Sequence, residues 1–211
     1  VGASAPYQNT ADMRTRGWEL SVNWRDQIGK VGYRVGFNLS DSQSKIVKYN
    51  SNESGILTSA LSNGSTFWNY YEGKDLGEIW GYEYDGFYTV DDFTDTSSWK
   101  LKEGVPSIDG YNPRPGDVKF KNLMDDDRGT NMISSGDNTV SNPGDRKVIG
   151  NNTPRYLYGI TLGANFKGFD LNVFMQGTGK RDAWIANNLK FPLYSDFKFI
   201  ALYKDLGNYW K

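Results

Sequence analysis

The chain has 211 residues, and 24 Lys and Arg against 25 Asp and Glu give it a formal net charge of −1. It contains no Cys and no His, which excludes a disulfide framework, a thiolate nucleophile, Ser-His-Asp catalysis and Cys-based zinc sites. The balanced charge, without a basic block, argues against nucleic acid as a partner. No apolar run is long enough for a membrane-spanning helix, whereas a transmembrane β-strand needs only ~10 residues of alternating polarity.

Two neighbouring segments near the start of the chain alternate between apolar and polar residues. On one face of the segment 17–25 lie four apolar residues, Trp18, Leu20, Val22 and Trp24. After a short turn at 27–29 the alternation resumes, and five residues share one face: Val31, Tyr33, Val35, Phe37 and Leu39. A period of two over this length predicts two β-strands joined as a hairpin.

A second pair of alternating segments lies far downstream. In the first, the apolar positions are Tyr158, Ile160, Leu162, Ala164 and Phe166. The dipeptide Lys167-Gly168 follows, a two-residue connection in which glycine can adopt a positive φ. The next segment alternates from Phe169 to Met175, although Phe174 falls among its polar positions. These segments predict a second antiparallel hairpin.

The connections between the strands are unequal in length. Each hairpin has a short turn, whereas the long segment 41–154 separates the two hairpins. Short turns at one end of the strands and long loops at the other are typical of outer-membrane β-barrels. We therefore expect an all-β fold, with antiparallel hairpins of a large transmembrane barrel and long extracellular loops. The expected parts are a barrel hairpin at 1–50, a long extracellular loop at 51–154, a barrel hairpin at 155–182 and the start of the next extracellular loop at 183–211. The alternative is a soluble β-sandwich, but four strands bury too little surface to order a chain of this length.

A series of short motifs occurs in order along most of the chain. It comprises Met13 to Leu20, Ser44-Lys45-Ile46, Glu72-Gly73, Gly77 to Tyr82, Asp85 to Tyr88, Pro115 to Phe120, Gly144-Asp145-Arg146 with Ile149-Gly150 and Pro154, Lys167 to Leu171, and Gln176 to Asp182. Each motif is weak alone, but their collinear order resembles the late barrel strands and loops of SusC/RagA-type TonB-dependent outer-membrane transporters.

This resemblance implies a function as well as a fold. It implies transport of glycan oligosaccharides or other large nutrients across the outer membrane of a Gram-negative cell, by a protein that is not an enzyme and needs no cofactor. The implied partners are a SusD-like surface lipoprotein, membrane lipid, and a TonB complex acting through a plug region that these residues do not contain. The residues 1–6 also lack the features of a signal peptide. The alternative function is a soluble or surface β-rich glycan-binding module.

The acidic residues of the long loop are possible metal ligands and possible catalysts. A calcium loop that starts at Asp125 would place Gly129 at a ligand position and Thr130 where glycine is needed, so no metal site is expected. A carboxylate pair for glycoside hydrolysis could come from Asp91, Asp92 and Asp95 or from 125–127. Adjacent loop aspartates usually form solvated turns, which argues against catalysis.

Aromatic residues crowd the long loop and are the candidate ligand-binding residues. Rings with a polar tip can stack on the C–H faces of sugars, and this loop also offers Asp and Asn for the hydroxyl groups. The alternative is that the rings pack the loop against itself, because a long insertion must bury apolar surface to be ordered. The candidates are Trp68, Tyr71, Trp80, Tyr82, Tyr84, Tyr88 and Trp99.

The last segment predicts a short helix. Ser195 can cap it, Gly207 can end it, and one apolar stripe is formed by Phe199, Leu202, Tyr203 and Leu206. Docking on a neighbouring loop is its expected role, and lying on a membrane surface is the alternative.

Overall fold

The computed structural model describes residues 9–60, 66–108, 110–124 and 131–184. In these ranges the regular structure consists of β-strands and one 3-10 helix, η1 (Val90–Asp92). No helix in the part of the chain described is long and apolar enough to cross a membrane. The helix predicted over 196–206 and the acidic turn predicted at 125–127 lie outside the described residues.

Within the described ranges, four strands are long and ten are short. The long strands are β1 (Ala11–Ile28), β2 (Val31–Tyr49), β13 (Arg155–Phe166) and β14 (Phe169–Lys180). The short strands are β3 (Thr58–Ala60), β4 (Thr66–Trp68), β5 (Glu78–Tyr82), β6 (Tyr84–Phe87), β7 (Phe93–Asp95), β8 (Lys100–Leu101), β9 (Ser107–Ile108), β10 (Val118–Phe120), β11 (Met132–Ile133) and β12 (Arg146–Asn151).

The chain divides into two compact units. The first, the sheet unit, comprises Val1–Glu53, Asn69–Glu78 and Asn151–Asp182, and the second, the loop unit, comprises Ser54–Trp68, Ile79–Gly150 and Ala183–Lys211. Residues 69–78 belong to the sheet unit although they fall within the expected loop 51–154.

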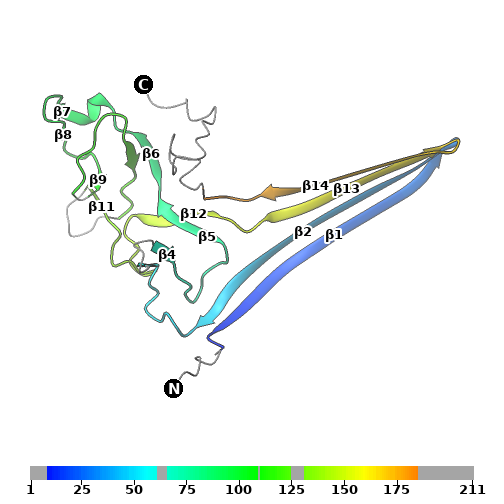
Figure 1. The fold of residues 1–211 in the computed structure, drawn as a ribbon, viewed down its shortest axis with the longest axis horizontal. Helices are drawn as coiled ribbons and strands as arrows, with labels where there is room; N and C mark the ends of the chain where they lie inside the picture. The colour runs from blue at the N-terminus through cyan, green and yellow to red at the C-terminus, as the bar shows by residue number, and fades with distance from the viewer. Residues whose placement is uncertain (1–8, 61–65, 109, 125–130, 185–211) are drawn as a thin grey trace, which may run out of the picture. The chain divides into compact units, whose positions relative to one another are not determined.

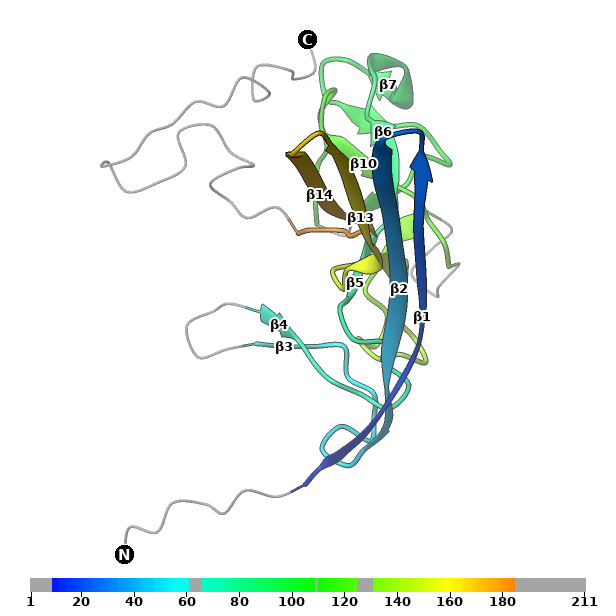
Figure 2. The same ribbon diagram turned by 90° about the vertical axis from the view of Figure 1, so that its right-hand side faces the viewer.

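The sheet unit is built on one antiparallel sheet in the order β1-β2-β13-β14 (Figures 1 and 2). Its two hairpin turns lie at the same end of the sheet, at 29–30 and 167–168 (Figure 1). Both residues of the second turn have positive φ, 46° at Lys167 and 84° at Gly168, which suits the right-handed twist of the strands. The predicted all-β fold of antiparallel hairpins is therefore confirmed, with strands that extend beyond the predicted segments.

Strand β2 changes its neighbour at Ser40, where its pairing with β13 ends. Beyond this point the segment 73–76 lies beside β2, and the backbone N–H of Ile46 donates to the Lys74 carbonyl over 2.9 Å. At the division, the guanidinium of Arg155 binds both carboxylate oxygens of Asp41, which is 8% exposed. The Asp41–Arg155 pair thus joins the two strands at the point where they separate.

The loop unit consists of five two-stranded sheets and a core of its own. The pairs are β3–β4, β5–β12, β6–β10 and β7–β8, together with the parallel pair β9–β11. Its fully buried carboxylate, Asp145, accepts the backbone N–H groups of Leu123, Met124 and Ser134 at 2.6, 2.9 and 2.7 Å. Three donors replace the water that this charge would otherwise bind, so Asp145 ties three loop segments together.

Candidate functional site

The four long strands separate apolar from polar residues onto opposite faces of the sheet. Leu20, Leu39 and Tyr158 form one row across three strands, and Ile160 and Met175 extend the next row to β14. Much of this apolar face is exposed: Val22 is 51%, Trp24 60% and Leu171 61% accessible. A contiguous apolar face of this size marks a surface that another apolar phase or partner covers.

The polar face is kept flat by glycines on the two central strands. Gly163 lies directly opposite Arg34, and Gly159 lies opposite Asn38. A Cβ on either glycine would overlap the side chain of its partner. Because these positions have no side chain, the arginine and the asparagine lie across the sheet and leave open space above it.

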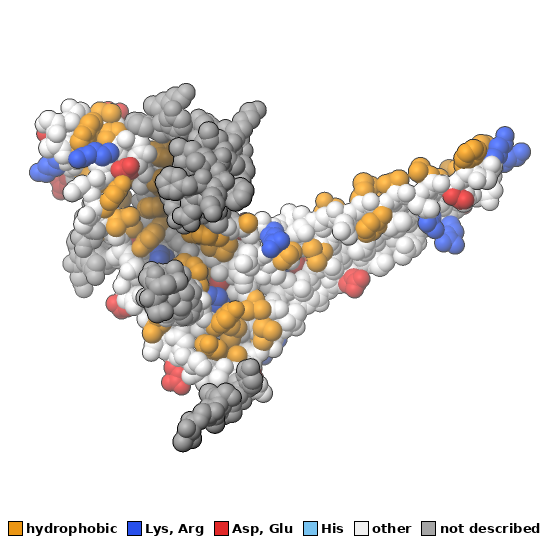
Figure 3. Space-filling view, in the orientation of Figure 1, with side chains coloured by type: hydrophobic (Ala, Val, Ile, Leu, Met, Phe, Trp, Pro, Cys, Tyr) orange, Lys and Arg blue, Asp and Glu red, His pale blue; other side chains and the backbone are white. Residues whose placement is uncertain are grey.

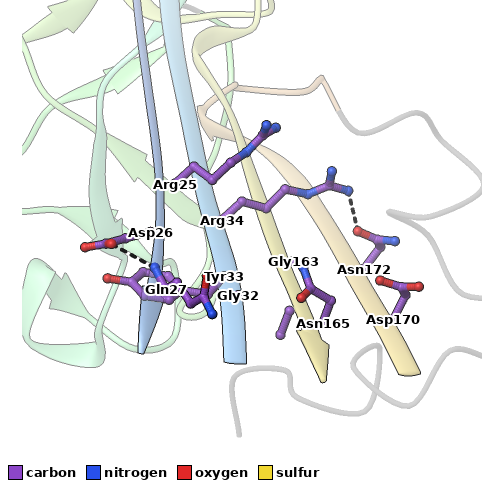
Figure 4. A pocket seen from close by; sticks show the side chains of 11 residues that line it. Arg25, Asp26, Gln27, Gly32, Tyr33, Arg34, Gly163, Asn165, Asp170 and Asn172 are labelled. Carbon is purple, nitrogen blue, oxygen red and sulfur yellow. Dashed lines mark hydrogen bonds between the residues drawn. The ribbon is translucent and has the colours of Figure 1, made fainter. Parts of the chain in front are cut away.

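Two rows of polar residues border a hollow near the turn end of this face. One row runs Arg25, Arg34, Gly163 and Asn172 across the four strands, and the next row runs Gln27, Gly32, Asn165 and Asp170. The hollow measures about 590 Å³ and all eight residues line it. Figure 4 shows Arg25 and Arg34 extending from neighbouring strands to the same side.

The hollow carries charges of both signs, because Asp26 and Asp170 line it together with Arg25 and Arg34. Arg25 and Arg34 lie directly opposite each other, an arrangement of like charges that disfavours folding unless something else compensates it. The guanidinium of Arg34 reaches over Gly163 and donates to the side-chain oxygen of Asn172. Figure 3 shows Lys or Arg side chains together with an acidic side chain at this end of the sheet. Guanidinium and amide groups suit hydrogen bonds to carboxylates, sulfates or sugar hydroxyls.

Tyr71 is one of the predicted ring residues and lies in the sheet unit. It is 4% exposed, and its hydroxyl donates to Glu78. The ammonium of Lys74 lies 5.2 Å from the centre of the Tyr71 ring and donates to the Asn69 carbonyl over 2.8 Å. Burial lowers the pKa of Lys74. Tyr71 therefore packs within the segment 69–78 and stabilises it through the hydrogen bond to Glu78.

Three of the predicted rings lie in or beside the core of the loop unit. Tyr88 is 3% exposed, and its hydroxyl donates to the Pro106 carbonyl over 2.5 Å. Its ring and that of Trp99 both contact Phe93, at centroid distances of 6.2 and 5.4 Å. Trp80 is 9% exposed. Burial raises the pKa of Tyr88 to about 12.

The remaining predicted rings are more accessible. Trp68 is 38% and Tyr84 55% exposed. Tyr84 makes an edge contact with Phe87 at 5.7 Å, and Tyr82 packs at 5.5 Å against Phe120 on the paired strand β10. Of the seven candidates, these exposed rings offer the most surface to a ligand, whereas Tyr71, Trp80 and Tyr88 offer little.

Two carboxylates of the loop, Asp95 and Glu83, are held in their ionised form. Hydrogen bonds from the Ser98 hydroxyl and the Ser97 backbone hold the pKa of Asp95 well below its usual range. Lys121 and Lys147 together lower the pKa of Glu83 to about 2. A general acid needs a raised pKa, so neither group suits that role. Among the residues described, no group of three or more His, Cys, Asp or Glu could hold a metal ion.

Among known proteins, the chain is similar to a TonB-dependent receptor, although no known family model matches it. Over 182 residues, or 84% of its length, the chain is 29% identical to "TonB-dependent receptor P3" of Formosa agariphila (strain DSM 15362 / KCTC 12365 / LMG 23005 / KMM 3901 / M-2Alg 35-1). The matched region spans 16% of that relative. The similarity supports a TonB-dependent receptor family and does not single out the SusC/RagA type within it.

The hollow itself was missed by the sequence analysis. Alternation places Arg25 and Arg34 on polar faces, but it does not reveal that the two residues face each other. The register does so, because a turn at 29–30 aligns 25 with 34. Counting outward from that turn would have found the pair, whereas the partnership with Gly163 and Asn172 needed the pairing of β2 with β13.

Proposed function

We propose that the chain is part of a TonB-dependent outer-membrane transporter of the SusC/RagA type, which imports glycan oligosaccharides or another large nutrient. The observation that carries this proposal is the two-faced sheet, whose apolar face is exposed and whose turns share one end. The similarity to a TonB-dependent receptor over 84% of the chain supports it independently.

The dimensions of the apolar face suit a bilayer. On β1 the outward residues from Trp18 to Trp24 are apolar, and Ile28 lies at the turn end of the same face. A tilted transmembrane strand needs ~9–11 residues, which matches this length. Trp18 and Tyr158 stand near one border, where aromatic residues gather at membrane interfaces. In this arrangement the polar face and its hollow line the barrel interior.

The proposal assigns no chemical step to this chain. The loop unit meets a SusD-like surface lipoprotein outside the cell, and exposed rings such as Trp68 and Tyr84 contact the incoming ligand or that partner. A TonB complex acts on a plug elsewhere in the transporter, and the interior face then lets the nutrient pass. The outer membrane of a Gram-negative cell is the proposed location.

Uptake by the whole protein in its own cell tests this proposal. Deletion of the gene should abolish growth on one class of oligosaccharide, and the full-length protein should fractionate with the outer membrane. Restored growth should depend on TonB. A full-length protein found only in soluble fractions would contradict the proposal.

A β-rich glycan-binding module is the second candidate. It is favoured by the core of the loop unit together with its exposed rings, Trp68 and Tyr84. This module would be soluble and monodisperse without detergent, and it would bind glycan through those rings. The barrel segment would instead require detergent, so size-exclusion chromatography with and without detergent separates the two candidates.

A further inference from the structure

The outward face of β1 changes from apolar to basic beyond Trp18. The register is continuous from Ile28 to Met13, so Trp18, Arg16 and Arg14 point to the same face at successive alternate positions. On β2 the residues opposite the two arginines are Gln43 and Lys45. The apolar part of this face is therefore followed directly by a basic part.

The two arginines carry uncompensated charge. Both are exposed, and within the ranges that the structure describes no ion pair includes Arg14 or Arg16. Three acidic residues near this level have a basic residue beside them: Arg155 binds Asp41, Lys48 is opposite Asp12, and Lys45 is opposite Asp75. At this level of the described sheet, Arg14 and Arg16 are therefore available to an outside partner.

The spacing of the arginines suits one tetrahedral anion. Residues two apart on a strand lie ~6.6 Å apart, so two long guanidinium side chains can converge on a single group. The planar guanidinium binds phosphate oxygens in pairs, with a geometry that lysine lacks. The arginine pair is therefore suited to a phosphate group.

We propose that Arg14 and Arg16 bind the phosphate headgroup of a membrane lipid on the loop side of the bilayer. The inference rests on the proposed function, because it needs the apolar face of the sheet to lie in a membrane. Trp18 and Leu20 continue the same face toward the turn end, so the acyl chains of the lipid would contact them while its phosphate meets the arginines. That continuity favours a lipid over free phosphate.

Native mass spectrometry of the full-length protein in detergent micelles tests the proposal. The probes are dioleoyl phosphatidylglycerol, dioleoyl phosphatidylcholine and inorganic phosphate, added separately. The variant is Arg14→Gln with Arg16→Gln, and its matched control is Lys100→Gln with Lys102→Gln, which removes the same charge from exposed loop residues. A further variant, Arg14→Lys with Arg16→Lys, keeps the charge but not the paired geometry.

The expected result is that the double glutamine variant binds phosphatidylglycerol about tenfold more weakly than the parent, since each lost bond to a charged group contributes to affinity. The lysine variant should fall between the two, the loop control should match the parent, and added salt should weaken binding. If the double variant fails to fold as a heat-modifiable barrel, the single substitutions are measured instead, and each should weaken the binding of phosphatidylglycerol.

Two results would overturn the proposal. One is equal retention of phosphatidylglycerol by the parent and the glutamine variant. The other is arginine-dependent binding of inorganic phosphate that matches the lipid in strength, which would indicate a free-anion site. Failure of the proposed function is distinguishable, because the full-length protein would then not fractionate with the outer membrane at all.

Discussion

The four-stranded sheet exposes its apolar residues, whereas the loop unit buries several of its own. Every residue of β1 is exposed, including Trp24 at 60%. In the loop unit, Leu57 is 0% and Ile133 3% exposed, so apolar side chains cover one another there. The sheet thus depends on surroundings that supply an apolar phase, whereas the loop unit has a core of its own.

Substitution of Asp145 should destabilise the loop unit most strongly while leaving the sheet unchanged. Asp145→Ala leaves three backbone N–H groups, one of them buried, without their acceptor, and we expect a loss of about 3 kcal/mol in stability. Limited proteolysis of the full-length protein should show faster cleavage within 79–150. The control is Asp137→Ala, an exposed carboxylate bound to Asn142, and equal cleavage of both variants would refute the assignment.

Adjacent positions on β1 test the opposite nature of the two sheet faces. Val22→Arg places a charge on the apolar face and should cost about 2–4 kcal/mol if that face meets the middle of a bilayer. Asn23→Arg, its neighbour on the polar face, should cost far less. Reversible unfolding of the full-length protein from lipid vesicles measures both. Equal costs would contradict a lipid-facing role for Val22.

Alkaline pH should destabilise the core of the loop unit, in which Tyr88 is buried. The pKa of Tyr88 is raised to about 12 from its ordinary 10.0, so the folded form keeps a proton that the unfolded form loses between these values. Stability is therefore fully present below pH 10 and falls by about 1–2 kcal/mol as pH rises toward 12. Tyr88→Phe should reduce this slope in a pH series of urea titrations. An unchanged slope would show that other groups cause it.

The smallest expected effect concerns the floor of the hollow. Gly163→Ala should displace the Arg34 side chain and break its hydrogen bond to Asn172, at a cost of about 1 kcal/mol. Ala164→Gly, next in sequence but on the apolar face, leaves Arg34 in place. Unfolding of both variants under the conditions used for Val22→Arg provides the measurement, and an Arg34→Gln background should remove the effect of Gly163→Ala.

The regular strands were predictable because period-two alternation is a local property. The segments 17–25 and 158–166 were found on that basis, but β1 and β13 both extend further because hydrogen bonding to a neighbour continues past the last clean alternation. The membership of 69–78 in the sheet unit could not be predicted, since it depends on backbone bonds to β2 across a large gap in sequence.

The candidate rings illustrate the same limit. The sequence indicates that the long loop is rich in aromatic residues, but only three-dimensional packing distinguishes Tyr88 in the core from Tyr84 at the surface. They lie four residues apart in one stretch rich in rings, Tyr82 to Tyr88, so the local composition does not separate them. Their roles toward a ligand stay predictions.

The all-β class, the two hairpins and the separation of apolar from polar faces can be predicted from residue order alone. These follow from residue periodicity and turn chemistry, which act over a few residues. The folded chain was needed to show that Arg25, Arg34, Gly163 and Asn172 share one row and that Asp145 is buried and accepts three N–H donors. Strand register and burial are set by contacts between distant segments, and no local pattern encodes which segments will meet.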